Sequence, residues 1–130
     1  MNSENNVVLD LSLVFSVEVM DFCELLKKQG RNILSDQLFR SGTSIGANIH
    51  EAQGAESRAD FIHKLKIAFK EASETEYWLK LCEMSTHYPA NMSLSAKVLS
   101  LKKLLSKIIS TAKANKTEFS SGNNNQSNNQ

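Results

Sequence analysis

A row of hydrogen-bonding side chains at helical spacing is the part of this sequence best suited to chemistry. Residues 34–54 read LSDQLFRSGTSIGANIHEAQG. At about 100° per residue, one arc of a helix would carry five polar residues: Gln37, Arg40, Ser44, Asn48 and Glu51. Most of these groups have a fixed donor and acceptor geometry that flexible lysines lack. We interpret the row either as a polar network that ties this helix to its neighbours or as a binding row.

Catalysis is not favoured by these residue types. The row has no histidine or cysteine, so Glu51 is its only candidate general base. His50 and Glu51 match the start of an HExxH zinc motif, but Gly54 stands where the second histidine is needed. Cys23 and Cys82 have no Cys or His at metal-ligand spacing. We therefore expect no enzymatic activity, no metal or other cofactor, and no small-molecule substrate.

A seam of small and apolar residues runs beside the polar row. Its members fall within one arc of the same helix: Leu34, Leu38, Ser41, Ile45, Ile49 and Ala52. Glycines such as Gly42 and Gly46 are poor helix formers. They make sense where another helix approaches so closely that a larger side chain would hold it off. The seam therefore predicts tight helix packing.

Four amphipathic segments account for most of the chain. We expect helices over residues 10–28, from 32 or 35 to 54, from 57 to about 87 and from 93 to 116. The last of these carries the clearest apolar stripe: Leu94, Val98, Leu101, Leu105, Ile108 and Ala112. Short connections between four such helices predict an all-α, antiparallel up-down-up-down bundle in residues 10–116. Residues 1–9 are expected to be a loose lead-in and residues 117–130 a disordered tail rich in Asn, Gln and Ser.

A carboxylate lies in the expected core face of the first helix. That face comprises Leu11, Val14, Phe15, Phe22, Leu25 and Leu26. Glu18 falls in its middle, where an unpaired charge would be too costly to bury. By helical phase, Arg40 is the expected partner of Glu18.

Two further apolar stripes lie away from the expected core. They are Leu13, Val17 and Met20 on the first helix, and Ile67, Trp78 and Leu81 on the third. Exposed on a monomer, such stripes would favour association, with Trp78 as the expected anchor because tryptophan dominates interface energetics. The alternative is that these helices bury more than one face within the bundle. We favour a homo-oligomer.

Composition sets limits on the class of protein. The chain has 130 residues, 41% of them hydrophobic, and a net charge of +1, which is typical of one globular domain without a strong preference for polyanions. It begins without a signal-peptide pattern and has no long apolar run, so we expect a cytoplasmic protein with no membrane partner. Nucleic-acid binding has local support only, from six lysines: Lys64, Lys66, Lys70, Lys97, Lys103 and Lys107. Ordinary solubilising charges are the alternative explanation.

These segments also resemble a known family. The stretch QLFRSGTSIGANIHEAQG, followed by DFIHKLKIAFKEASETEYWL, is similar to the signature of bacterial four-helix bundle proteins encoded in intervening sequences of large-subunit (23S) rRNA genes. The matching positions are Gln37, Arg40, Ser41, Ser44, Ile45, Asn48, Ile49, Glu51, Phe61, Leu65, Ala68, Glu74 and Leu79. The resemblance implies a pentameric ring that acts as a scaffold. A related branch, the accessory protein of diversity-generating retroelements, implies binding to nucleic acid and a reverse transcriptase, and a protein-only scaffold is a further alternative.

Overall fold

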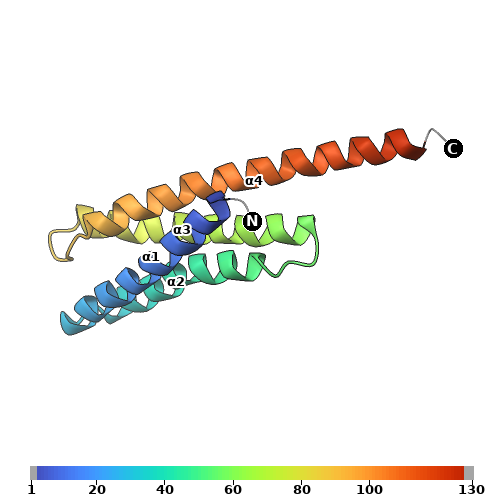
Figure 1. The fold of residues 1–130 in the computed structure, drawn as a ribbon. Coiled ribbons are helices and arrows are strands. Elements are labelled where there is room, and N and C mark those ends of the chain that lie inside the picture. The colour runs from blue at the N-terminus through green and yellow to red at the C-terminus, as the bar shows by residue number, and fades with distance from the viewer. Residues whose placement is uncertain (1–2, 128–130) are drawn as a thin grey trace.

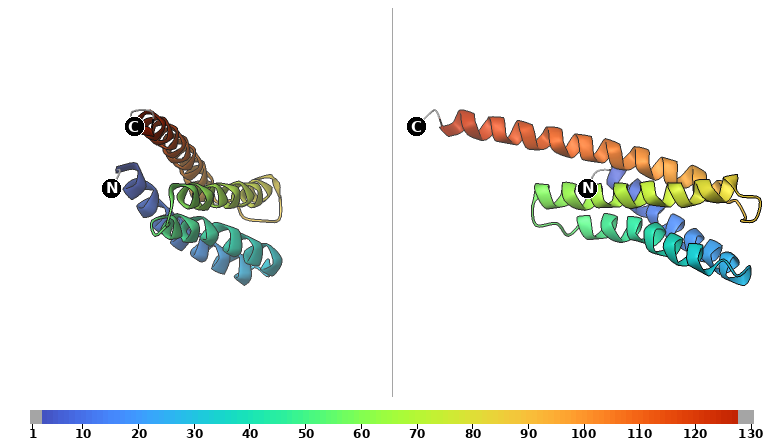
Figure 2. Two further views of the ribbon diagram at one scale, coloured as in Figure 1. Left: turned by 90° about the vertical axis from the view of Figure 1, so that its right-hand side faces the viewer. Right: turned by 180° about the vertical axis from the view of Figure 1, so that it is seen from behind.

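Four helices form the computed structural model (Figure 1). They are α1 (Ser3–Lys28), α2 (Asn32–Ala52), α3 (Arg58–Met84) and α4 (Met92–Ser127). The structure describes the backbone of residues 3–127 and the side chains of residues 4–115. Each helix packs on its neighbours in the chain, and α4 returns to pack on α1. This order confirms the predicted all-α, up-down-up-down four-helix bundle, in which the α1–α2 hairpin lies obliquely across the α3–α4 hairpin (Figure 2).

The core comes from one stripe on each helix, and on α4 it is the predicted stripe. All six residues of that stripe are buried, from Leu94 to Ala112. On α1 the prediction was partly wrong, because Val14 and Leu25 are exposed and Val8 and Val19 are buried instead. The reason is that α1 is apolar around most of its circumference, so periodicity alone does not fix which side faces the core.

Both chain ends differ from the expectation. The predicted loose lead-in over residues 1–9 is wrong from Ser3 onward, because α1 already begins there and buries Val8 completely. At the other end, α4 continues to Ser127 and extends past the other three helices (Figure 1). The end of α4 therefore lies within the segment 117–130 that was expected to be disordered. No proline follows Pro89, so every residue of this segment keeps the backbone N–H that a helix needs. Residues 128–130 lie outside the described residues.

Side-chain caps fix the starts of α3 and α4. Ser57 Oγ accepts a hydrogen bond from the backbone N–H of Asp60 at 3.0 Å, as its sequence position predicts. At α4 the cap lies two residues before the helix start expected at residue 93, because Asn91 Oδ1 accepts from the backbone N–H of Leu94 at 2.9 Å. The earlier cap leaves the Ser93 hydroxyl available for a contact with α1.

The α1–α2 pair is held close by missing side chains. A Cβ atom added to Gly42 would lie 2.8 and 2.9 Å from the two γ-methyl groups of Val19. A Cβ atom at Gly46 would lie 3.0 Å from Ser16 Oγ. All three distances are shorter than ordinary van der Waals contact, so the small seam of α2 does serve a close helix approach, with α1 as the partner.

Candidate interaction surfaces

The polar row of α2 lies along α3 and is largely open to solvent. The Arg40 guanidinium pairs with Glu71 at 3.5 Å and with Glu74, while Glu51 accepts from Lys64 Nζ at 3.1 Å. The side chains of Arg40 and Glu51 are 51% and 58% exposed. Ion pairs with this exposure contribute little to stability. They cross-link α2 and α3 at the surface without creating a buried charged site.

The remaining members of the row bond mainly within α2. Ser44 Oγ donates to the Arg40 carbonyl, and Asn48 Nδ2 donates to the Ser44 carbonyl at 2.8 Å. The Gln37 side chain is exposed. The row is thus a pair of surface ion-pair clusters joined by local side-chain-to-backbone bonds, and its role in binding stays a prediction.

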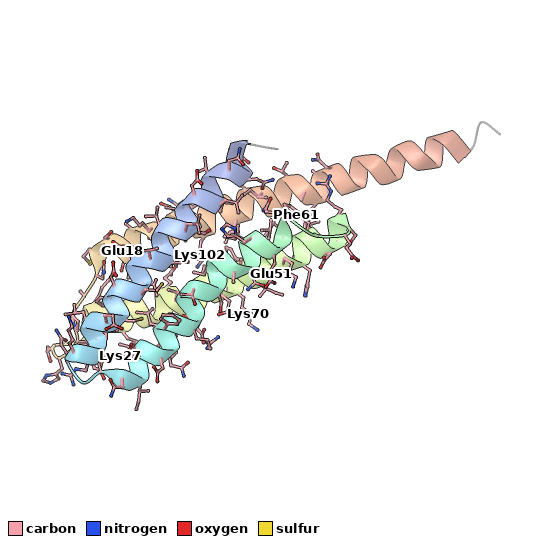
Figure 3. All side chains as sticks on the ribbon, turned by 60° about the horizontal axis from the view of Figure 1, so that its bottom comes forward. Glu18, Lys27, Glu51, Phe61, Lys70 and Lys102 are labelled. Carbon is pink, nitrogen blue, oxygen red and sulfur yellow. The ribbon has the colours of Figure 1, made fainter. Side chains whose placement is uncertain are left out.

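The predicted pair between Glu18 and Arg40 is wrong. Glu18 accepts a hydrogen bond from Ser93 Oγ at 2.6 Å and lies 3.5 Å from Lys97 Nζ. Its carboxylate is on the side of α1 that faces α4 (Figure 3), whereas Arg40 is on the side of α2 that faces α3. The need for a partner was correctly inferred, but helical phase could not identify which neighbouring helix supplies it.

Buried hydroxyl groups link the helices at a place where the sequence indicated only packing. Thr75 Oγ1 lies 2.9 Å from Ser41 Oγ and 2.8 Å from the Glu71 carbonyl. One proton from each hydroxyl satisfies both contacts if Ser41 donates to Thr75 and Thr75 donates to the carbonyl. Ser41 and Thr75 are fully buried, so this pair joins α2 to α3 inside the core.

Two thiols are also buried in the core. Ser35 Oγ donates to the Cys23 carbonyl at 3.0 Å, and Cys23 Sγ contacts the Ser35 carbonyl at 3.4 Å. Burial raises the pKa of both Cys23 and Cys82 above the ordinary thiol value. Neither thiol is in a disulfide. Among the side chains of residues 4–115, no three of the His, Cys, Asp and Glu type are grouped so that they could hold a metal ion.

Among the described side chains, α1 carries more of the exposed large hydrophobic residues than any other helix. Leu13, Val17 and Met20 are 53%, 58% and 47% exposed, and Val7 and Val14 extend the same face. We call these five residues the α1 outer face. The first of the two extra stripes is therefore unpartnered in the single chain.

The second extra stripe, on α3, is less open. Trp78 packs against the core and also contacts the Tyr77 ring, with 5.3 Å between ring centroids. Ile67 is half-buried, which leaves Leu81 as the most exposed of the three at 40%. The Trp78 Nε1–H is buried without a hydrogen-bond partner among the described residues. Because it is partly buried against the core, Trp78 is a poorer anchor than its residue type indicated.

The six candidate nucleic-acid lysines do not form one free surface. Three of them pair with carboxylates of the same chain: Lys64 with Glu51, Lys97 with Glu18, and Lys107 with Glu4. Lys70 points away from the bundle (Figure 3), and neither it nor Lys103 pairs with an acidic side chain in the part of the chain whose side chains are described. Lys66 lies against Lys113, and this contact lowers the pKa of Lys66. Positive charge is concentrated where α3 and α4 meet.

A shallow groove of about 640 Å³ runs along that junction on the outside of the bundle. We call it the α3–α4 groove; its lining residues are Phe69, Leu99, Lys102, Lys103, Ser106, Lys107 and Ser110. Lys66 and Ile109 continue it along the helices. The Lys102 ammonium lies 5.2 Å from the centroid of the Phe69 ring and 3.1 Å from Glu76. The groove therefore combines an apolar floor with basic edges.

Comparison with known proteins places the chain in a family. No curated protein matches it. Separately, none of the helices within the described residues is long and apolar enough to cross a membrane. It is similar to a crystal structure of a protein with unknown function from the S23 ribosomal protein family of Bacteroides thetaiotaomicron VPI-5482. The two share 46% identity over 82% of this chain and 98% of that chain, with a TM-score of 0.77. The family model of the 23S rRNA-intervening sequence protein matches residues 4–111, so the chain belongs to the 23S rRNA-intervening sequence protein family.

Proposed function

We propose that this chain is a non-enzymatic cytoplasmic scaffold that works by assembling into a homo-oligomer. The observation that carries the proposal is the α1 outer face, with five aliphatic side chains that are each about half exposed. A patch of this kind on a soluble protein usually marks an interaction site. The pentameric stoichiometry comes from the family resemblance.

The proposal places the interface on α1 and gives α3 a smaller part. Burying the exposed halves of five aliphatic side chains would stabilise an oligomer through the hydrophobic effect. Ile67 and Trp78 have less free surface to contribute, because much of it is already buried in the bundle. Leu81 can still lie at the margin of a contact.

A pair of matched variants tests the proposal. Val17→Glu places a charge at the most exposed position of the α1 outer face, while Ile33→Glu places one on an aliphatic residue of α2 that is 84% exposed. We expect the wild type and Ile33→Glu to have a light-scattering mass near five times 14.5 kDa, and Val17→Glu to move toward the monomer mass with unchanged helicity. A wild type that stays monomeric at every concentration would overturn the proposal.

Binding of RNA or DNA, and of a protein such as a reverse transcriptase, stays a prediction of the family resemblance. Three of the six candidate lysines, Lys66, Lys70 and Lys103, form no salt bridge to an acidic side chain among the described residues and are available to an anionic ligand, whereas the other three are paired within the chain. Titrating the wild type with a structured RNA at rising salt tests this role. A polyanion contact must weaken steeply as salt increases.

A further inference from the structure

We propose that the α1 outer face of one copy docks into the α3–α4 groove of a second copy, so that subunits join head to tail. The inference deepens the proposed function and rests on it, because it names the two surfaces that assembly would bring together. It follows from three features of those surfaces: residue chemistry, charge and length.

The α1 outer face is acidic as well as apolar. Asp10, Asp21 and Glu24 are exposed on the same side of α1 as the aliphatic residues. No basic residue occurs in the chain before Lys27. Along most of its length the face therefore presents aliphatic groups flanked by carboxylates. No basic side chain of α1 lies among them.

The α3–α4 groove has the complementary composition. Phe69, Leu99 and Ile109 supply apolar surface, and the lysines that border it are Lys66, Lys102, Lys103, Lys107 and Lys113. Among the residues whose side chains are described, two carboxylates also face this region: Glu76 pairs with Lys102, and Glu4 pairs with Lys107 at 2.8 Å. Lys66 and Lys103 form no salt bridge to a described acidic side chain, so this part of the groove keeps an excess of positive charge.

The two surfaces also match in extent. At 1.5 Å per residue, the α1 outer face with its flanking acids covers residues 7–24, or roughly 26 Å of helix. The α4 edge of the groove covers residues 99–113, or roughly 21 Å. If α1 of one copy lies along the groove of another, its aliphatic side chains meet the apolar residues of the groove and its carboxylates meet the lysines over most of that length.

Charge decides between this arrangement and the symmetric one. If two α1 outer faces packed on each other, their carboxylates would come together without lysines to balance them, and like charges at an interface are strongly unfavourable. Contact between two different surfaces is heterologous, and such contacts build rings when the rotation closes. A closed ring would leave no α1 outer face and no groove unoccupied.

Charge reversal tests the pairing without disturbing the fold. The first variant is Asp10→Lys/Asp21→Lys, the second is Lys66→Glu/Lys103→Glu, and the third combines all four changes. None of these four residues forms a salt bridge to an opposite charge in the described part of the chain. Lys28→Glu/Lys70→Glu is the control for the second variant, since it makes the same change of net charge at two exposed lysines outside the groove.

We expect the first two variants each to raise the concentration needed for assembly about tenfold or more, because each brings like charges together. The combined variant should assemble nearly as well as the wild type, and the control should be unaffected. Each is measured by light-scattering mass across a dilution series at low salt. Val17→Glu and Lys66→Glu/Lys103→Glu should also form a discrete 1:1 heterodimer when mixed, because each keeps one intact surface.

Two results would overturn the inference while leaving the scaffold proposal standing. They are a wild-type mass for the groove variant and no recovery of assembly in the combined variant. If the groove variant keeps the wild-type mass but loses RNA binding, the groove is a nucleic-acid surface. A wild type that is monomeric throughout would instead remove the proposed function itself.

Discussion

Replacing Gly42 with alanine should destabilise the bundle, although a glycine-to-alanine change at an exposed position in a helix usually stabilises the helix. In an ordinary helix interior, alanine is favoured over glycine by about 0.5–1 kcal/mol. Here the new Cβ would lie 2.8 and 2.9 Å from both γ-methyl groups of Val19, a stiff β-branched side chain with no exposure. Overpacking of this kind costs about 1–3 kcal/mol. We expect a net loss of about 0.5–2 kcal/mol.

A double-mutant cycle with Val19→Ala isolates the clash. Val19→Ala alone should cost about 2 kcal/mol, because it removes two buried methyl groups and leaves a cavity. In the double variant the new methyl at residue 42 fills part of that space, so the combined loss should fall below the sum of the single losses by about 1 kcal/mol or more. Gly46→Ala is the control, because its nearest neighbour is the Ser16 hydroxyl at 3.0 Å and its cost should be close to zero.

Urea unfolding followed by circular dichroism measures these free energies. Assembly would make stability depend on protein concentration. The double-mutant cycle is therefore measured at one fixed concentration and repeated with Val17→Glu added to every variant. A Gly42→Ala variant that gains about 0.5–1 kcal/mol would refute the close approach of α1 and α2. Strict additivity with Val19→Ala would show that the clash does not involve that side chain.

The structure makes three further predictions about stability. Arg40→Ala should cost less than about 1 kcal/mol in urea unfolding, because its ion pairs are exposed, and a loss above about 2 kcal/mol would mean that it supports something buried. Thr75→Val should cost about 1–3 kcal/mol by leaving the buried Ser41 hydroxyl without this partner, and adding Ser41→Ala should recover part of the loss. Equal stability of the Thr75→Val single variant and the double variant would contradict the bond. Burial raises the pKa of Cys23 and Cys82, so the folded state keeps its protons when the unfolded thiols lose theirs, and stability should fall as pH rises above the ordinary thiol pKa of 9.0. Urea midpoints from pH 8 to 10 should show a shallower fall in Cys82→Ala than in the wild type, and parallel curves would contradict this.

Much of the fold could be predicted because local periodicity and caps are properties of the sequence itself. The α4 stripe from Leu94 to Ala112 has one apolar side, so its spacing alone identified the buried residues. Ser57 was recognisable as a cap from its position three residues before an acidic side chain. The glycines of α2 indicated a close helix contact because a missing side chain has few other uses in a helix interior.

What the sequence could not determine was which helix each surface faces. Glu18 needed a partner, but choosing Lys97 over Arg40 depends on the side of α1 on which α4 packs. The half-burial of Trp78 and the exposure of Val17 likewise depend on how the helices are rotated against each other. A stripe with one apolar side fixes its own burial, whereas a helix that is apolar on two sides has its exposed face chosen only by the neighbours that pack against it.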